Sequence, residues 1–500
     1  MRKFFKTVAF VTVFSICEKF LGFLYRIYLS RSIGSEGVGM YQVALSVFAF
    51  LLTLTCSGTP ITVSRLITKY DALGRQDDAR KVITAGLLFT LMISVPICVL
   101  FFILGNKISF LFADERCVKI FYVVLPGLVF TSLYSIIRGA LWGRKDFLPY
   151  SITELLEEIC MIVVGIILIS NATSAYQGAY YAGVAVLVSY VFSFSLATAV
   201  FFLRKNSLKN PRKLFKPLIS SAMPVTAMRT VNSLAVSIVS VILPLRLVSA
   251  GYTESQAMTL FGAAAGQAIP LLFIPTTLIG SFTLVLVPEI AENFYKKKHI
   301  SLKNDVEKSL KFTMLLTSLF VPVFLVCGEE IGVLVFGSYE CGKYLTASAF
   351  LMIFMSLSSL STSILNSIGL EKRALYYTII SGIFMLLSIY FLPKYVGIYA
   401  LLIGFTFVYG LTTILNLRLI RKKCTAKPNF IRFLFSAGLL VIPSTLLGIM
   451  LEKMLLHLLG SVLTFLVCSA VVMIFNLLLC FGFGLVDAQI IIKRLKRKTA

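Results

Sequence analysis

The chain has 500 residues, of which 58% are hydrophobic and only 14% are charged, and its mean hydropathy is +0.92. These values exclude an ordinary soluble globular protein and indicate an integral membrane protein. The net charge of +25 would suit a nucleic-acid-binding protein, but the way the basic residues are distributed between the apolar runs favours a topological role.

Apolar runs of about 20 residues, long enough to cross the bilayer as a helix, predict the transmembrane segments. In chain order they cover 8–29, 38–57, 82–104, 120–138, 150–170, 178–203, 217–243, 257–287, 312–335, 344–368, 374–392, 396–417, 430–450 and 460–483. We therefore predict an all-α polytopic membrane protein with about fourteen transmembrane helices. The first run contains Glu18, Lys19 and Arg26 and no small-residue cleavage site, so it is predicted to be a helix of the fold and not a signal peptide.

Lys and Arg residues are unevenly divided between the two sides of this predicted topology. With a cytoplasmic N-terminus, the even-numbered connections and both tails carry 36 of the 47 basic residues, and the odd-numbered connections carry eight. This asymmetry follows the positive-inside rule. We therefore predict a multi-pass protein of the cytoplasmic membrane with both termini in the cytoplasm. The tail sequence KRLKRK is predicted to contact anionic lipid and not nucleic acid.

Metal and nucleotide sites are not predicted. The ten cysteines have no CxxC spacing and the only histidines, His299 and His457, lie in predicted loops. The segment GSYECGK (337–343) resembles a P-loop, but Tyr344 follows where Ser or Thr is required, and the segment falls in a predicted outer loop. No cofactor is predicted, so transport must use an ion gradient or the substrate's own gradient.

Two pairs of positions suggest an internal repeat. Gly143 and Gly369 each stand seven residues before a Tyr, at an offset of 226 residues, and Pro60 and Pro288 each close an apolar run at an offset of 228. A six-helix repeat preserves orientation, so the halves are predicted to be parallel repeats with substrate bound between them.

The repeat predicts three parts of the chain. They are an N-lobe of helices 1–6 (residues 1–205), a C-lobe of helices 7–12 (residues 206–425), and helices 13 and 14 with a basic cytoplasmic tail (residues 426–500).

The first predicted connection is rich in glycine. It reads SRSIGSEGVGMYQVALSV (30–47) and contains Gly34, Gly37 and Gly39. Glycine lets helix ends approach closely or shift against one another, which favours an extracytoplasmic gate. The alternative is a tight turn in which Arg31 and Glu36 are solvated or paired.

Three basic residues lie inside predicted spans. A basic residue at the centre of a span costs roughly 2.5–3.5 kcal/mol and usually faces a cavity or a partner. Lys19 and Arg26 are seven residues apart, on one helical face and about 10 Å apart along the axis. Arg229 stands near mid-membrane in the seventh span. Because guanidinium groups bind phosphate oxygens bidentately, we predict that these residues bind a diphosphate. The alternatives are that Arg26 snorkels and that Lys19 pairs with Glu18.

Three glutamates share one face of the fifth span. Glu154, Glu157 and Glu158 have i, i+3 and i+4 spacing. In an apolar helix they require cations, and two functional interpretations follow: a coupling site for Na⁺ or H⁺, or a latch to cavity arginines that phosphate releases. The structural alternative is ion pairing with Arg138 and Arg144 of the neighbouring helix end.

Several blocks of the sequence are similar to one known superfamily. They are R-x-IG-x-EG-x-G-x-Y (31–41), IIRGALWGRKDFLPYSITELLEEI and FGAAAGQAIPLLFIPTTLIGSFTLVLVPEIAE. They resemble the polysaccharide-transport branch of the multidrug/oligosaccharidyl-lipid/polysaccharide (MOP) flippase superfamily, and most closely the stage V sporulation protein B group. The resemblance implies a two-lobed, fourteen-helix fold like that of the lipid II flippases, which move undecaprenyl-pyrophosphate-linked sugars across the bacterial cytoplasmic membrane. Arg26 and Arg229 resemble in placement the cavity arginines of those flippases.

The predicted function is that of a transporter and not an enzyme. The leading hypothesis is a flippase for an undecaprenyl-pyrophosphate-linked glycan, a peptidoglycan precursor of the lipid II type, with the spore cortex as one destination. Its predicted partners are the lipid-linked sugar diphosphate, membrane lipids and cell-wall synthesis proteins. The alternative is a cation-coupled exporter of drugs or metabolites from the same superfamily. A membrane glycosyltransferase or hydrolase would need a long polar loop bearing paired carboxylates, and the predicted outer loops are too short.

Overall fold

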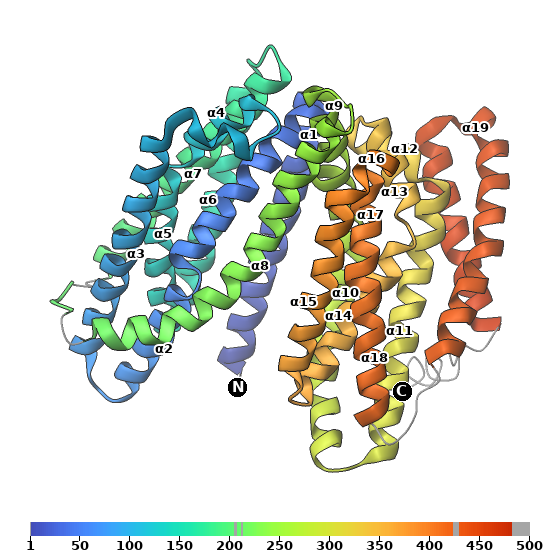
Figure 1. Cartoon of the computed structure of the whole chain (residues 1–500). Coiled ribbons are helices and arrows are strands. Elements are labelled where there is room, and N and C mark those ends of the chain that lie inside the picture. Colours follow the sequence, from blue (N-terminus) through green and yellow to red (C-terminus); the bar gives the residue numbers. More distant parts are fainter. Residues whose placement is uncertain (1, 205–207, 212–213, 424–429, 483–500) are drawn as a thin grey trace. The chain divides into compact units, whose positions relative to one another are not determined.

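The computed structural model describes residues 2–204, 208–211, 214–423 and 430–482, and none of them forms a β-strand (Figure 1). The prediction of an all-α membrane protein is confirmed. By its internal packing the chain divides into two compact units, residues 1–262 (unit 1) and 263–500 (unit 2). This division does not test the repeat-based lobes, which stay a prediction. The basic tail KRLKRK lies outside the described residues.

Unit 1 contains nine α-helices and a short 3₁₀ segment. They are α1 (Arg2–Cys56), α2 (Thr59–Ala72), α3 (Gln76–Leu104), η1 (Gly105–Leu111), α4 (Glu115–Val124), α5 (Gly127–Gly143), α6 (Phe147–Ile169), α7 (Ala175–Leu203), α8 (Phe215–Ser249) and α9 (Glu254–Phe261). Side-chain caps begin several of them. Asp114 accepts a hydrogen bond from the backbone N–H of Arg116 at the start of α4, and Thr253 and Gln256 form a capping box at the start of α9.

The second group of helices begins at the boundary with a π-helical segment. They are η2 (Gly262–Ala268), α10 (Ile269–Tyr295), α11 (His299–Val326), α12 (Gly328–Phe336), α13 (Tyr339–Ala347), α14 (Leu351–Ser367), α15 (Glu371–Phe391), α16 (Pro393–Val396), α17 (Tyr399–Thr406), η3 (Phe407–Leu411), α18 (Thr412–Lys423) and α19 (Phe430–Gly482).

Helix α1 consists of two arms that meet at Gly34. The backbone there has φ 68° and ψ 176°, which is not helical and which a residue with a Cβ rarely adopts. The continuous apolar segment Val13–Ala72 has 60 residues, or about 90 Å of helix, three times the thickness of the hydrocarbon core. It therefore contains two membrane passes joined at Gly34. A second break of the same kind divides α19 at Gly460.

Within the described residues, nine helices are long and apolar enough to cross a membrane, or eleven if each of two bent pairs is one span. The segment Val13–Ala72 counts once in that total, although its length requires two passes. The number fourteen itself stays a prediction.

Four helix–helix turns share one backbone geometry. Gly74, Lys145, Lys297 and Gly369 have positive φ, and each stands two residues before the next helix. In each turn the following N–H donates to the carbonyl five residues before it, as Arg75 does to Tyr70 and Leu370 to Leu365. This is the Schellman arrangement, which pairs the last carbonyls of a helix. The turns are related by offsets of 223 and 224 residues, close to the repeat offsets in the sequence.

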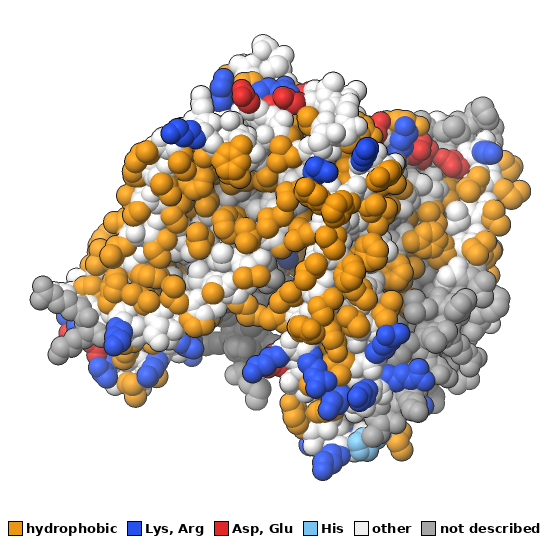
Figure 2. Space-filling model, viewed as in Figure 1, with side chains coloured by type: hydrophobic (Ala, Val, Ile, Leu, Met, Phe, Trp, Pro, Cys, Tyr) orange, Lys and Arg blue, Asp and Glu red, His pale blue; other side chains and the backbone are white. Residues whose placement is uncertain are grey.

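Basic side chains gather near these turns. In Figure 2, hydrophobic side chains cover the middle of the visible face of unit 1, and Lys and Arg gather near the end where Figure 1 places the α2–α3 turn. Unit 2, taken by itself, has the same distribution, with Lys and Arg gathered near its α10–α11 turn. A belt of apolar surface bounded by charged ends is the pattern expected of a membrane protein.

The charge asymmetry makes a first testable prediction about topology. A reporter enzyme fused after Lys298, in the α10–α11 turn, should report a cytoplasmic position, and one fused after Lys343, in α13, an extracytoplasmic one. The measurement is paired alkaline phosphatase and fluorescent-protein activity in cells. Reversal of either signal would contradict the predicted orientation.

Candidate functional site

The glutamate face of α6 packs against helices α1, α5 and α7 of unit 1. Glu154 is paired: Arg138 Nη1 of α5 donates to its Oε1 at 2.5 Å, and the two side chains are 36% and 17% exposed. This confirms the structural alternative for Glu154. Arg138 itself lies inside α5. Arg144 interacts instead with Asp71 and Asp146.

Two aromatic rings fix the position of Arg138. Its guanidinium carbon lies 5.7 Å from the ring centre of Tyr134 and 5.8 Å from that of Tyr150. Cation–π contacts of this kind stabilise a guanidinium that has lost part of its hydration. The Arg138–Glu154 pair is therefore part of the scaffold of unit 1 and keeps α5 and α6 in register.

Glu157 and Glu158 differ from Glu154, because neither forms an ion pair with any described residue. Both are half-buried. Glu157 interacts with Ser193 of α7, which is fully buried. Glu157 also interacts with Arg138, at longer range than the Glu154 pair. A partly buried carboxylate without a direct ion pair is costly unless it binds a proton or a metal cation.

The carboxylate of Glu158 lies directly against helix α1. A Cβ atom placed on Gly22 would be 2.9 Å from Glu158 Oε1, so the absence of a side chain at Gly22 provides the space for this carboxylate. Glu158 also interacts electrostatically with Glu18 of α1. The α1–α6 contact therefore brings two carboxyl groups together, which favours the binding of a positive charge between them.

Buried tyrosines surround this pair of helices. Tyr25 is 4% exposed, packs over Gly165 of α6, and has a buried hydroxyl with no hydrogen-bond partner among the described residues. Tyr25, Tyr41 and Tyr190 all interact electrostatically with Glu158. The sequence analysis did not single out these tyrosines, because an aromatic residue in an apolar run carries no signal of which helix face it occupies.

The structure places the predicted phosphate ligands at different depths in unit 1. Arg26 is half-buried in the first arm of α1 and interacts with Tyr41 of the second arm. Arg229, on α8, is exposed, and its Nη1 donates to the carbonyl of Ser57 at 3.4 Å. Tyr41 and Ser57 are sixteen residues apart along the second arm, or about 24 Å. The residues that the two arginines interact with are thus farther apart along this arm than a diphosphate is long.

Lys19 lies between these two levels. It is exposed on the first arm of α1, seven residues before Arg26, and interacts electrostatically with its neighbour Glu18. At a helical rise of 1.5 Å per residue the three basic residues form a series with steps of about 10–13 Å.

The glycines of the α1 bend have different roles. Gly34 forms the bend itself. A Cβ atom on Gly37 would lie 2.9 Å from the carbonyl oxygen of Ala175, and one on Gly39 would overlap the carbonyl oxygen of Met258 and lie 3.1 Å from the amide nitrogen of Gly262. Gly37 and Gly39 are therefore points of close backbone approach, to α7 and to α9 respectively. Their role in a gate stays a prediction.

A salt bridge secures the same bend. Arg116 Nη2 of α4 donates to Glu36 Oε1 at 2.7 Å and also contacts the buried Asp114 at 2.7 Å. Glu36 is therefore paired, which is one of the arrangements expected for a structural turn.

A cavity of about 380 Å³ in unit 2 was not predicted. It lies among α10, α14, α15, η3 and α18. Its lining surface is mostly apolar, although seven of the lining residues are Ser or Thr: Thr276, Ser358, Ser359, Thr362, Ser363, Thr378 and Thr412. Its residues are spread over more than 130 positions of the chain, so no local sequence pattern could have indicated it.

The fold defines a class of membrane transporter. A solved structure of the lipid II flippase MurJ in an inward closed conformation matches with a TM-score of 0.68 at 15% identity, over 93% of this chain and 98% of that chain. An inward-facing multidrug resistance MATE transporter of the MOP superfamily matches with a TM-score of 0.67 at 15% identity, over 82% and 94% of the two chains. Both matches show that the chain has the fold of these transporters.

Comparison of the sequence with known families identifies a narrower group than the fold does. The family described as "Polysaccharide biosynthesis protein" matches residues 4–294, more than half of the chain, and the protein belongs to it. Two curated relatives from Bacillus subtilis (strain 168) are Stage V sporulation protein B, 24% identical over 397 residues (76% of each chain), and Lipid II flippase MurJ, 22% identical over 413 residues (75% of each chain).

Proposed function

We propose that the protein is a flippase that moves an undecaprenyl-pyrophosphate-linked glycan, a peptidoglycan precursor of the lipid II type, across the cytoplasmic membrane by alternating access. The observation that carries this proposal is the presence of Arg26 and Arg229 within long apolar helices of unit 1. The family and the relatives named as a lipid II flippase and a sporulation protein support a lipid-linked glycan as substrate and spore cortex synthesis as one use.

The different depths of the basic residues refine this proposal. Arg229, Lys19 and Arg26 act as successive contacts for the diphosphate along unit 1, because the positions that they occupy along the arms of α1 span more than the length of a diphosphate. Each contact replaces part of the hydration that the phosphate groups lose on entering the protein.

The energy for transport comes, in this proposal, from a cation bound near Glu157 and Glu158. Glu154 is ion-paired with Arg138. Glu157 interacts with Arg138 without forming an ion pair with it, and Glu158 forms no ion pair with a described residue. The coupling ion is H⁺ or Na⁺. The latch hypothesis is less well supported, since the paired glutamate uses Arg138 and not Arg26 or Arg229.

The test of substrate class is the lipid that the protein retains. The protein is purified from its native membrane in mild detergent, and extracted lipid is examined by mass spectrometry of the headgroup. Enrichment of a lipid-linked sugar diphosphate over the bulk membrane lipid supports the proposal. The proposal would be contradicted if the protein retained only bulk phospholipid and also failed to bind added lipid II.

A second prediction separates coupling from scaffolding on α6. Glu157→Gln together with Glu158→Gln should leave folded yield and lipid binding near the parent values while reducing gradient-driven flipping at least tenfold, because the cation site is gone. Glu154→Gln is the matched control: it leaves Arg138 without its ion-pair partner and should reduce folded yield, since the guanidinium then lies in a partly buried position without its carboxylate. Normal flipping by the folded double variant would rule out coupling at this face.

A cation-coupled exporter of drugs or metabolites is the second candidate. It is favoured by the same unpaired Glu157 and Glu158 and by the MATE transporters among the structural matches. It predicts gradient-dependent efflux of organic cations by the purified protein in vesicles, which the lipid flippase should not show.

A further inference from the structure

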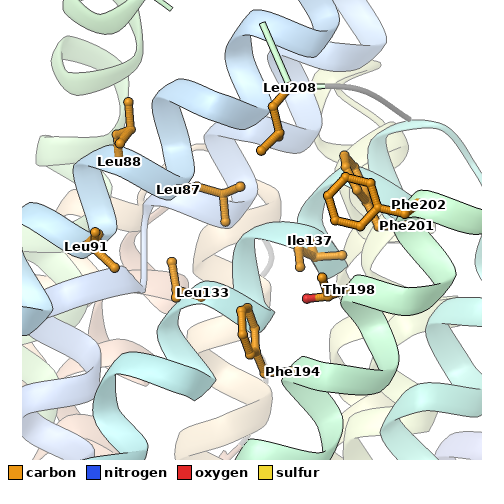
Figure 3. Close-up of a pocket in the computed structure, with 10 residues that line it drawn as sticks. All are labelled: Leu87, Leu88, Leu91, Leu133, Ile137, Phe194, Thr198, Phe201, Phe202 and Leu208. Carbon is orange, nitrogen blue, oxygen red and sulfur yellow. The ribbon is translucent and has the colours of Figure 1, made fainter. Parts of the chain in front are cut away.

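An apolar cavity opens on the surface of unit 1, away from the glutamate face. It has a volume of about 210 Å³ and lies among α3, α5, α7 and the segment that follows α7 (Figure 3). Its lining is Leu87, Leu88, Leu91, Leu133, Ile137, Phe194, Thr198, Phe201, Phe202 and Leu208. Four of these side chains, Leu88, Leu91, Phe202 and Leu208, are more than one-third exposed, so the cavity is a pocket with an open mouth.

The chemistry of the lining favours a hydrocarbon occupant. Figure 3 shows one oxygen among the ten side chains, that of Thr198, and this buried hydroxyl has no hydrogen-bond partner among the described residues. An ordered water needs two to four polar partners, which this pocket does not offer. An empty pocket would leave the surrounding side chains without dispersion partners on one side.

A basic rim lies beside the pocket. Lys209 follows Leu208 directly; its backbone N–H donates to Thr84 Oγ1 of α3 at 3.1 Å, and its Nζ contacts Asp77 at 2.6 Å. These bonds hold the Leu208 segment against α3. Arg204 at the end of α7 is exposed and pairs with Asp146 at 3.3 Å, and Lys216 at the start of α8 is exposed.

This rim is charge-complementary to the inner leaflet of the membrane. The end of unit 1 that carries it holds the α2–α3 turn and is the one that the Lys and Arg distribution predicts to be cytoplasmic. The cytoplasmic leaflet is rich in anionic lipid, and each Lys or Arg near its surface contributes attraction to it. Pocket and rim together have the chemistry of an acyl chain joined to an anionic headgroup.

We propose that this pocket binds one acyl chain of an anionic phospholipid of the cytoplasmic leaflet. The headgroup of this lipid contacts the basic rim formed by Lys209, Arg204 and Lys216. The bound lipid fills the space between α3, α5 and α7 and is a resident of unit 1, separate from the transported molecule. The proposal needs neither Arg26 nor the glutamates of α6, so it stands whether or not the flippase proposal does.

The experiment uses the single tryptophan of the chain. In a Trp142→Phe background, Leu88→Trp places a fluorophore at the mouth of the pocket, and Leu100→Trp, at the far end of the same helix and 52% exposed, is the matched control. The full-length proteins are reconstituted in phosphatidylcholine vesicles that contain dibrominated phosphatidylglycerol or dibrominated phosphatidylcholine as quencher.

We expect quenching at position 88 to report a roughly fivefold preference for phosphatidylglycerol over phosphatidylcholine, the ratio that about 1 kcal/mol from one basic residue gives. Quenching at position 100 should show no preference between the two lipids. Lys209→Gln with Lys216→Gln should bring the ratio at position 88 towards one. Equal quenching by the two lipids at position 88 would overturn the proposal.

Two substitutions inside the pocket add a second test. Thr198→Phe fills the space and should abolish the preference, whereas Thr198→Val keeps the size of the side chain and should retain it. Unbrominated undecaprenyl phosphate serves as competitor: relief of quenching at position 88 at an equal mole fraction would assign the pocket to the substrate's chain and refute a resident phospholipid. Should Thr198→Phe fail to fold, the comparison of positions 88 and 100 decides the question alone.

Discussion

Replacing Arg26 or Arg229 with alanine should reduce flipping of a lipid-linked sugar diphosphate by roughly ten- to a hundred-fold. A charge-assisted hydrogen bond to a phosphate is worth about 1.5–3 kcal/mol, and each arginine is predicted to supply such bonds at its own depth. The measurement is flipping of fluorescent lipid II in vesicles, with folded yield as control. Lysine at either position should restore activity only in part, because it retains the charge but loses the fork that matches two phosphate oxygens.

Equilibrium binding distinguishes two ways in which these arginines could act. If they are successive contacts about 24 Å apart, binding should weaken in only one alanine variant, the one whose site is occupied at rest, and the double variant should bind no worse than that one. If another conformation brings both onto one diphosphate, binding should weaken in each variant and further in the double variant. Wild-type flipping by Arg229→Ala would remove Arg229 from the transport path and favour the exporter.

Gly39→Ala should destabilise unit 1 by about 3 kcal/mol, at the upper end of the cost of overpacking. A Cβ at this position would overlap the carbonyl oxygen of Met258 and press on the backbone of Gly262. Main-chain atoms cannot turn aside as a side chain can, so the helices would have to separate. The measurement is thermal unfolding in detergent, with size-exclusion chromatography to report the folded fraction.

The matched control is Gly382→Ala, in the interior of α15, where a Cβ would meet nothing within 4 Å. This change should raise stability by about 0.5–1 kcal/mol, because alanine is the better helix former. If Gly39→Ala proved as stable as Gly382→Ala, the close approach at Gly39 would be absent in the membrane. If it folded but flipped slowly, the glycine would act in movement of the helices and not only in their packing.

The features predicted best from the sequence are those set by one helix or one turn. The apolar runs gave the helices, the glycine-rich segment 30–47 gave the reversal at Gly34, and the i, i+3, i+4 spacing gave the shared face of the α6 glutamates. The pairing of Glu154 with Arg138 was also among the alternatives. Each depends on residues close in the chain, where helical geometry fixes relative positions.

The features that escaped prediction depend on how helices pack. The depth of Arg229 relative to Arg26 follows from the register of α8 against the second arm of α1, which hydrogen bonds such as that from Ser237 to Ser46 set. The surroundings of Glu158 depend on which helix crosses α6 at Gly22. The pocket beside Thr198 combines three helices and a connecting segment. Hydrophobic periodicity indicates that a face is buried, but not against which neighbour or at what register.

The four turns with left-handed residues bear on how the chain enters the membrane. Two of them use lysine, Lys145 and Lys297, where glycine would be relaxed, and a left-handed backbone costs a residue with a Cβ about 1–2 kcal/mol. The other two place Arg75 and Lys372 within three residues of the glycine. Every one of these helical hairpins therefore carries a positive charge at its tip. Each pair of helices can be oriented as it leaves the ribosome, before the rest of the chain has been made, and the strain at Lys145 and Lys297 is the cost of keeping that signal at the turn itself.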